Sequence, residues 1–105
     1  MITTEITQEF IKALDGEHYF DAHEVLEKIW YENRHKDSNE VKLIKGFINA
    51  ATSFELYKLG RISASNKVWK NYLKYRQLIF KTGSDKVALY YEISLHVDNV
   101  KKKIS

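Results

Sequence analysis

Hydrophobic positions recur three and four residues apart in five segments of the chain, separated by glycines and small polar clusters. This spacing places the apolar side chains of each segment on one face of an α-helix. No segment alternates apolar and polar residues with the two-residue period of a strand. We therefore predict five helices, covering approximately residues 4–14, 18–34, 37–59, 63–82 and 84–104.

Local signals mark the ends of these helices. Asp37 is expected to cap the third helix, because Glu40 follows it by three positions, which is the spacing of an N-terminal capping box. Ser63 or Ser65 is expected to cap the fourth helix, and Ser84 the fifth. Gly60 stands where a left-handed residue would end the third helix.

The composition supports the same fold. The chain has 105 residues, four glycines, and neither proline nor cysteine. Its length suits one domain, and the shortage of turn-forming residues favours helices joined by short connections. The predicted fold class is therefore all-α, a single-domain antiparallel bundle of about five helices over residues 1–105. The absence of cysteine excludes disulfides, thiolate metal sites and cysteine nucleophiles.

The length of the apolar stretches and the character of the N-terminal segment predict the cellular location. The longest apolar stretch, around residues 46–54, is broken by polar side chains and is far shorter than the roughly 18 residues of a membrane span. The N-terminal segment MITTEITQEF has neither the basic start nor the apolar region of a signal peptide. We therefore expect a cytoplasmic protein with no membrane partner.

The second predicted helix contains the most informative segment, HEVLEKIW. Its core direction passes through Leu26, and a second stripe with His23, Glu27, Trp30 and Arg34 lies about 40–100° away from Leu26. His23 and Glu27 are four residues apart, so an imidazole nitrogen and a carboxylate oxygen can converge on one ion or one proton. A pair with this spacing is more often a simple hydrogen bond or ion pair.

The third predicted helix places a carboxylate among its apolar residues. Glu55 lies about 20° from Ile44, which marks the apolar face. A buried, unpaired carboxylate costs several kcal/mol, so Glu55 must pair, coordinate, take up a proton or reach water at a frayed helix end. Lys45 and Asn49 flank the same face, and Gly46 indicates a close helix crossing.

His23, Glu27 and Trp30 match the HxxxExxW hallmark of an uncharacterised bacterial and archaeal group, domain of unknown function family 309. The chain resembles this family over about residues 10–80, and the segment beginning at Gly46 resembles its second block. The resemblance implies an all-helical bundle with a metal-binding role and no established reaction. Lys45 stands where that block usually has a glutamine, so its ammonium is an alternative source of the positive charge that a metal ion would bring.

Two forms of the site follow from these residues. In the first, His23 nitrogen with Glu27 and Glu55 oxygens binds a divalent metal such as Zn, Mn or Fe. In the second, Lys45 or Arg34 neutralises the carboxylates and the cluster is a buried structural network. Both place a semi-buried polar site between helices two and three. The predicted function is that this site binds a metal or a small molecule, and whether the protein is an enzyme stays open. The predicted site residues are His23, Glu27, Trp30 and Glu55, supported by Lys45, Asn49 and Arg34.

The charge distribution suggests a different class of function. Residues 1–55 carry 11 acidic and 6 basic side chains, whereas residues 56–105 carry 3 acidic and 11 basic ones. The alternative function is therefore a non-catalytic interaction module that uses the basic half to bind protein or nucleic acid. For the lysines near Trp69 we favour a solvated face over nucleic-acid binding, and Tyr91 with Leu95 would suit a homodimer contact. These lysines are Lys67, Lys70, Lys74 and Lys81.

Overall fold

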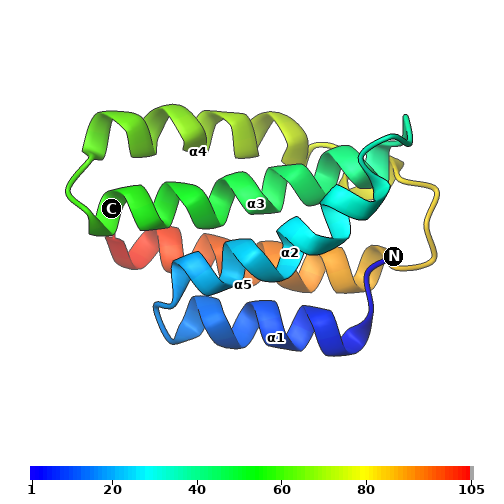
Figure 1. The fold of residues 1–105 in the computed structure, drawn as a ribbon, viewed down its shortest axis with the longest axis horizontal. Coiled ribbons are helices and arrows are strands. Elements are labelled where there is room, and N and C mark those ends of the chain that lie inside the picture. Colours follow the sequence, from blue (N-terminus) through cyan, green and yellow to red (C-terminus); the bar gives the residue numbers. More distant parts are fainter. Residues whose placement is uncertain (105) are drawn as a thin grey trace.

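The computed structural model describes residues 1–104, and all regular structure within that range is helical. Successive α-helices run antiparallel, because each short connection returns the chain along its predecessor (Figure 1). The predicted all-α bundle is confirmed. The elements are α1 (Thr4–Asp15), α2 (Tyr19–Asn33), α3 (Asn39–Lys58), α4 (Ile62–Arg76), a short 3-10 helix (Ile79–Lys81) and α5 (Val87–Ile104).

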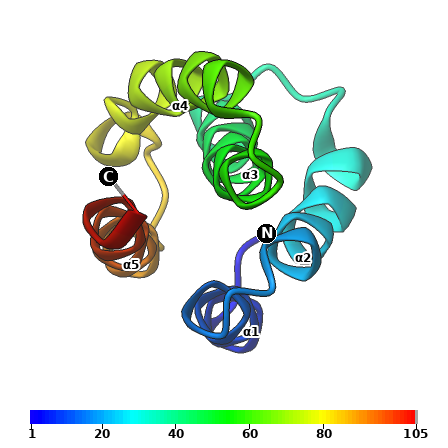
Figure 2. The same ribbon diagram turned by 90° about the vertical axis from the view of Figure 1, so that its left-hand side faces the viewer.

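Helix α3 is the central element. Seen along the helix axes, α4 and α2 flank it, α1 lies next to α2, and α5 lies next to α1 (Figure 2). Ten of its 20 residues are buried, which explains why its sequence is apolar on more than one side. Its exposed or half-buried polar positions include Lys42, Lys45 and Asn49.

The predicted apolar stripes form the core. Phe47 of α3 lies between two tyrosines of other helices, with its ring centroid 5.8 Å from that of Tyr72 and 6.3 Å from that of Tyr90. These contacts join α3, α4 and α5 through aromatic packing. The buried side chains that carry this periodic apolar pattern are Phe10, Leu14, Ala22, Leu26, Ile29, Val41, Ile44, Ile48, Ala51, Tyr72, Ile79, Tyr90, Ile93, Val97 and Val100.

The expected close crossing at Gly46 is confirmed. A Cβ atom built on Gly46 would lie 2.6 Å from the Cβ of Tyr75, well inside van der Waals contact. Only glycine lets α4 approach α3 this closely. The approach also holds Tyr75 against α3, half-buried rather than fully within the core.

Two predicted helix caps are wrong. Helix α3 is capped by Ser38, whose Oγ accepts a hydrogen bond from Val41 N at 3.2 Å, while Asp37 is exposed and pairs with Lys42. Helix α4 begins at Ile62 with no side-chain cap, earlier than Ser63 or Ser65 would place it. Ser65 is instead buried against α3, because its hydroxyl donates to the carbonyl oxygen of Ser53 at 2.7 Å.

The other helix ends agree more closely. Gly60 has a φ of 81° directly after α3, as predicted for a left-handed terminal residue. Ser84 Oγ accepts a hydrogen bond from Lys86 N at 3.0 Å just before α5. The fourth predicted helix was too long, since α4 stops at Arg76. In the part of the chain that the structure describes, no helix is both long and apolar enough to cross a membrane.

Candidate anion-binding cleft beside Trp30

His23 and Glu27 form a half-buried pair on α2. His23 Nε2 lies 3.3 Å from Glu27 Oε2, and His23 Nδ1 lies 3.6 Å from Glu24 Oε1. Glu27 Oε2 is fully covered and makes no hydrogen bond of good geometry within residues 1–104, and its ion-pair contact there is with the His23 imidazole. This is the side-chain pair that the four-residue spacing predicts.

Trp30 lies one turn farther along α2 and is half-buried against the core. The ammonium of Lys45 from α3 sits over its ring, with Nζ 4.3 Å from the ring centroid. The electron-rich face of an indole attracts a cation at this distance. Lys45 is thereby held beside α2, and Trp30 and Lys45 together form one wall of a cleft.

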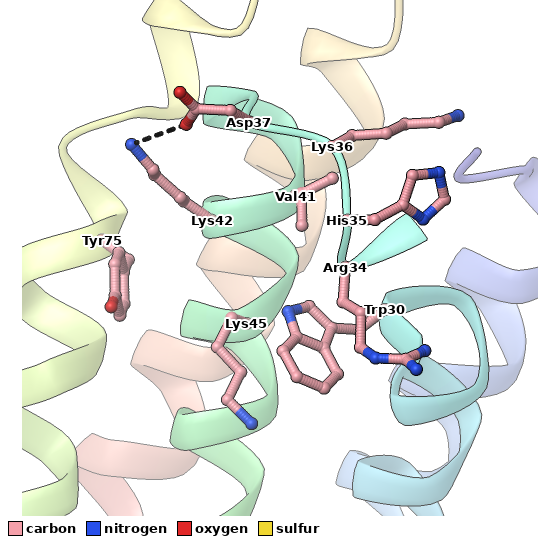
Figure 3. Close-up of a pocket in the computed structure, with 9 residues that line it drawn as sticks. All are labelled: Trp30, Arg34, His35, Lys36, Asp37, Val41, Lys42, Lys45 and Tyr75. Atoms are coloured by element: carbon pink, nitrogen blue, oxygen red, sulfur yellow. Dashed lines mark ion pairs between the residues drawn. The ribbon is translucent and has the colours of Figure 1, made fainter. Parts of the chain in front are cut away.

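The cleft is an open depression of about 450 Å³ between the C-terminal end of α2, the following turn and α3, with Tyr75 contributed by α4 (Figure 3). Trp30 points toward α3, whereas Lys36 extends away from the centre (Figure 3). The lining residues are Trp30, Arg34, His35, Lys36, Asp37, Val41, Lys42, Lys45 and Tyr75.

The charge of this cleft is strongly positive. Its lining has four lysine and arginine side chains and a single carboxylate. That carboxylate, Asp37 Oδ1, lies 3.6 Å from Lys42 Nζ, so it neutralises at most one of the four cations. Such an excess of positive charge raises the local concentration of anions.

Three of the predicted site residues meet at this cleft. Trp30, Arg34 and Lys45 line it. Arg34 donates a short hydrogen bond to the carbonyl oxygen of Tyr31, and its guanidinium carbon stacks 3.6 Å from the centre of the Tyr31 ring. Arg34 therefore forms part of the rim and is held by its own helix.

The other four predicted site residues lie outside the lining of the cleft. They are His23, Glu27, Asn49 and Glu55. The side chain of Glu55 is half-buried and has no ion pair or hydrogen bond among the described residues, which fits the alternative in which it reaches water. Within residues 1–104, neither Lys45 nor Arg34 pairs with a carboxylate, so the expected neutralisation is not seen.

The predicted metal set gains no support from this arrangement. Among residues 1–104, no three histidine or carboxylate side chains are grouped closely enough to bind a metal ion. His23 and Glu27 contact each other and Glu55 does not join them. Two protein ligands are fewer than the three that even an open catalytic zinc site uses, so the residues as arranged do not fit a metal.

The sequence did not indicate several residues of the cleft. Lys36 and Lys42 belong to the charged segment between residues 34 and 42, whose basic character was visible but had no periodic pattern. Tyr75 continues the apolar pattern of the fourth helix, and it packs on α3 while lining the cleft. Only the tertiary approach at Gly46 brings it next to Lys42.

Comparison with known proteins gives one result. The model of a family described as a domain of unknown function, DUF309, matches residues 7–68, which is more than half of the chain and includes His23, Glu27 and Trp30. No curated protein and no solved structure matches the chain. On the strength of this match, the chain belongs to the DUF309 family.

Proposed function

We propose that this protein binds a small anionic molecule, carrying phosphate or carboxylate groups, in the cleft beside Trp30. The observation that supports the proposal is the lining itself, in which four cations meet one carboxylate and that carboxylate is already paired with Lys42. The volume of about 450 Å³ lies within the range of small-molecule sites. Arg34 and Lys36 at the rim would attract the anion, and Lys42 and Lys45 would contact it.

Trp30 and Lys45 are proposed as the recognition pair. An ammonium that is held over an indole still has donors directed away from the ring, and these can bond an anion. In this proposal the His23–Glu27 pair is a positioning element, because it lies on the same helix one turn before Trp30. No chemical step is assigned, since among the described residues the carboxylate of the lining, Asp37, is paired with Lys42 and not with His35.

Tryptophan fluorescence tests this binding directly. The variant Trp69→Phe leaves Trp30 as the only indole, and titration with inorganic pyrophosphate at low salt is expected to change its emission in a saturable way. The further changes Lys42→Gln and Lys45→Gln should each weaken binding about five- to tenfold, the range of a charge-assisted hydrogen bond.

The matched control is Lys28→Gln, because Lys28 is an exposed lysine of the same helix α2 that faces α1 instead of the cleft. It should leave the pyrophosphate affinity within twofold. Binding that is equally weakened by all three lysine changes, or no change in emission, would contradict the proposal.

A further inference from the structure

The cleft beside Trp30 does not end at Tyr75. A second depression of about 320 Å³ lies between α3 and α4, and it shares Lys42 and Tyr75 with the first. Its other lining residues are Asn39, Lys74 and Leu78. The two depressions therefore adjoin across α3, with Tyr75 between them, and we call them together the basic groove.

The register of α4 extends the basic groove along that helix. With Lys74 as the reference, Lys67 lies about 20° and Asn71 about 60° around the helix, while the buried Tyr72 lies about 160° away. Lys67, Asn71 and Lys74 are all exposed. Seven residues of helix span roughly 10 Å, so these side chains continue the line of polar and basic groups beyond the depression.

The lysines that α4 adds to this line have no carboxylate partner among residues 1–104. Residues 56–84 contain seven lysines and arginines and no aspartate or glutamate. Arg76 pairs with Asp98 of α5 at 3.3 Å, but in the described part of the chain Lys67 and Lys70 have no ion-pair partner. Lys74 likewise has no ion pair within residues 1–104, and its Nζ lies 5.7 Å from the centroid of the Tyr75 ring. Their positive charge is therefore available to an external anion.

We propose that the basic groove binds single-stranded nucleic acid. A single phosphate group would occupy only one of the two depressions, whereas a phosphodiester chain presents repeated charges that match a line of lysines. Tyr75, which lines both depressions, supplies an aromatic surface on which an unpaired base stacks, and Lys45 over the Trp30 ring supplies a cation at the end of the groove. A groove with aromatic rings and no protruding helix suits unpaired bases better than the edges of a duplex.

This inference rests on the proposed function, because both use the cleft beside Trp30. The test is fluorescence anisotropy of the full chain with a labelled 12-residue oligouridylate, compared with a labelled mononucleotide. We expect the oligonucleotide to bind at least tenfold more tightly than the mononucleotide, with a steep dependence on salt. A 12-base-pair duplex is expected to bind at least tenfold more weakly than the single strand.

The decisive variants are two pairs with the same change in net charge. Lys67→Gln with Lys74→Gln should weaken oligonucleotide binding about tenfold and lower the salt slope by about 1.4, because each single-strand phosphate contact contributes roughly 0.7. Lys12→Gln with Lys28→Gln removes two exposed lysines from α1 and α2 and should change affinity less than twofold. An equal loss in both pairs would overturn the inference.

The remaining outcomes separate this inference from the proposed function. Pyrophosphate binding without any gain from oligonucleotide length would overturn the nucleic-acid inference and leave small-anion binding intact. Failure of both ligands would overturn both. Equally tight binding of the duplex, or full competition by polyglutamate at the same charge concentration, would show that the groove does not select single-stranded nucleic acid.

Discussion

At Gly46, α3 and α4 approach so closely that a methyl group has no room. Helix propensity alone would make Gly46→Ala stabilising by about 1 kcal/mol. The added Cβ would instead lie 2.6 Å from Tyr75 Cβ, an atom fixed to the backbone of α4, so the helices must separate. We expect a net loss of about 1–3 kcal/mol in the free energy of unfolding, measured with urea. A variant more stable than the parent would contradict this packing.

Two buried tyrosines differ in how their hydroxyl groups are satisfied. Tyr90 donates a hydrogen bond to the Glu40 carboxylate. Tyr72 Oη has no hydrogen bond of good geometry among residues 1–104, and the Arg76 guanidinium carbon lies 5.8 Å from the centroid of the Tyr72 ring. We expect Tyr90→Phe to lower the free energy of unfolding by about 1.5–3 kcal/mol, the range for a bond to a charged group. Tyr72→Phe should leave the free energy of unfolding unchanged or higher, since the hydroxyl that it removes is buried without a hydrogen bond of good geometry among residues 1–104. Equal losses in urea denaturation would contradict this contrast.

At the scale of helices, periodicity predicted the elements well and their ends less well. The stripes of α1, α2 and α5 were readable because burial repeats every three to four residues. Ser65 was interpreted as a cap because serine is common there, yet its place is decided by contact with Ser53, twelve residues earlier. A local pattern contains no information on such a partner, and for the same reason it could not end α4 at Arg76.

The serine pair joins α3 to α4 through two reciprocal hydrogen bonds. Ser53 Oγ donates to Ser65 O at 2.8 Å, Ser65 Oγ donates to Ser53 O at 2.7 Å, and both residues are buried. We expect Ser53→Ala and Ser65→Ala each to lower the free energy of unfolding by about 1 kcal/mol. The double variant should lose less than the sum, because the two hydroxyls are also 3.1 Å apart and act as one unit. Strict additivity in this double-mutant cycle would show that they act independently.

For the whole molecule, the sequence indicated part of the site. The angular stripe on α2 selected Trp30 and Arg34, and the flank of α3 selected Lys45, because each depends only on its own helix. The relation between helices was not readable, so Glu55 was expected beside His23, where the structure does not place it. Tyr91 and Leu95 are both about half exposed, and the homodimer contact that they suggested stays a prediction.

The tyrosines also control how the fold responds to alkaline pH. Burial raises the pKa of Tyr72 and Tyr90 above the ordinary value of about 10, and the hydrogen bond to Glu40 raises the pKa of Tyr90 further. Above pH 10 the unfolded chain therefore releases protons that the folded chain retains, and stability falls as pH rises, by up to about 1.4 kcal/mol per pH unit for each tyrosine. Below pH 10 this contribution is fully present.

The double variant Tyr72→Phe with Tyr90→Phe should lose less stability between pH 9 and pH 11 than the parent in urea denaturation. The control Tyr31→Phe, which changes an exposed ring, should follow the parent. If all three proteins lose stability equally over this interval, the buried phenols do not govern the alkaline limit of the fold.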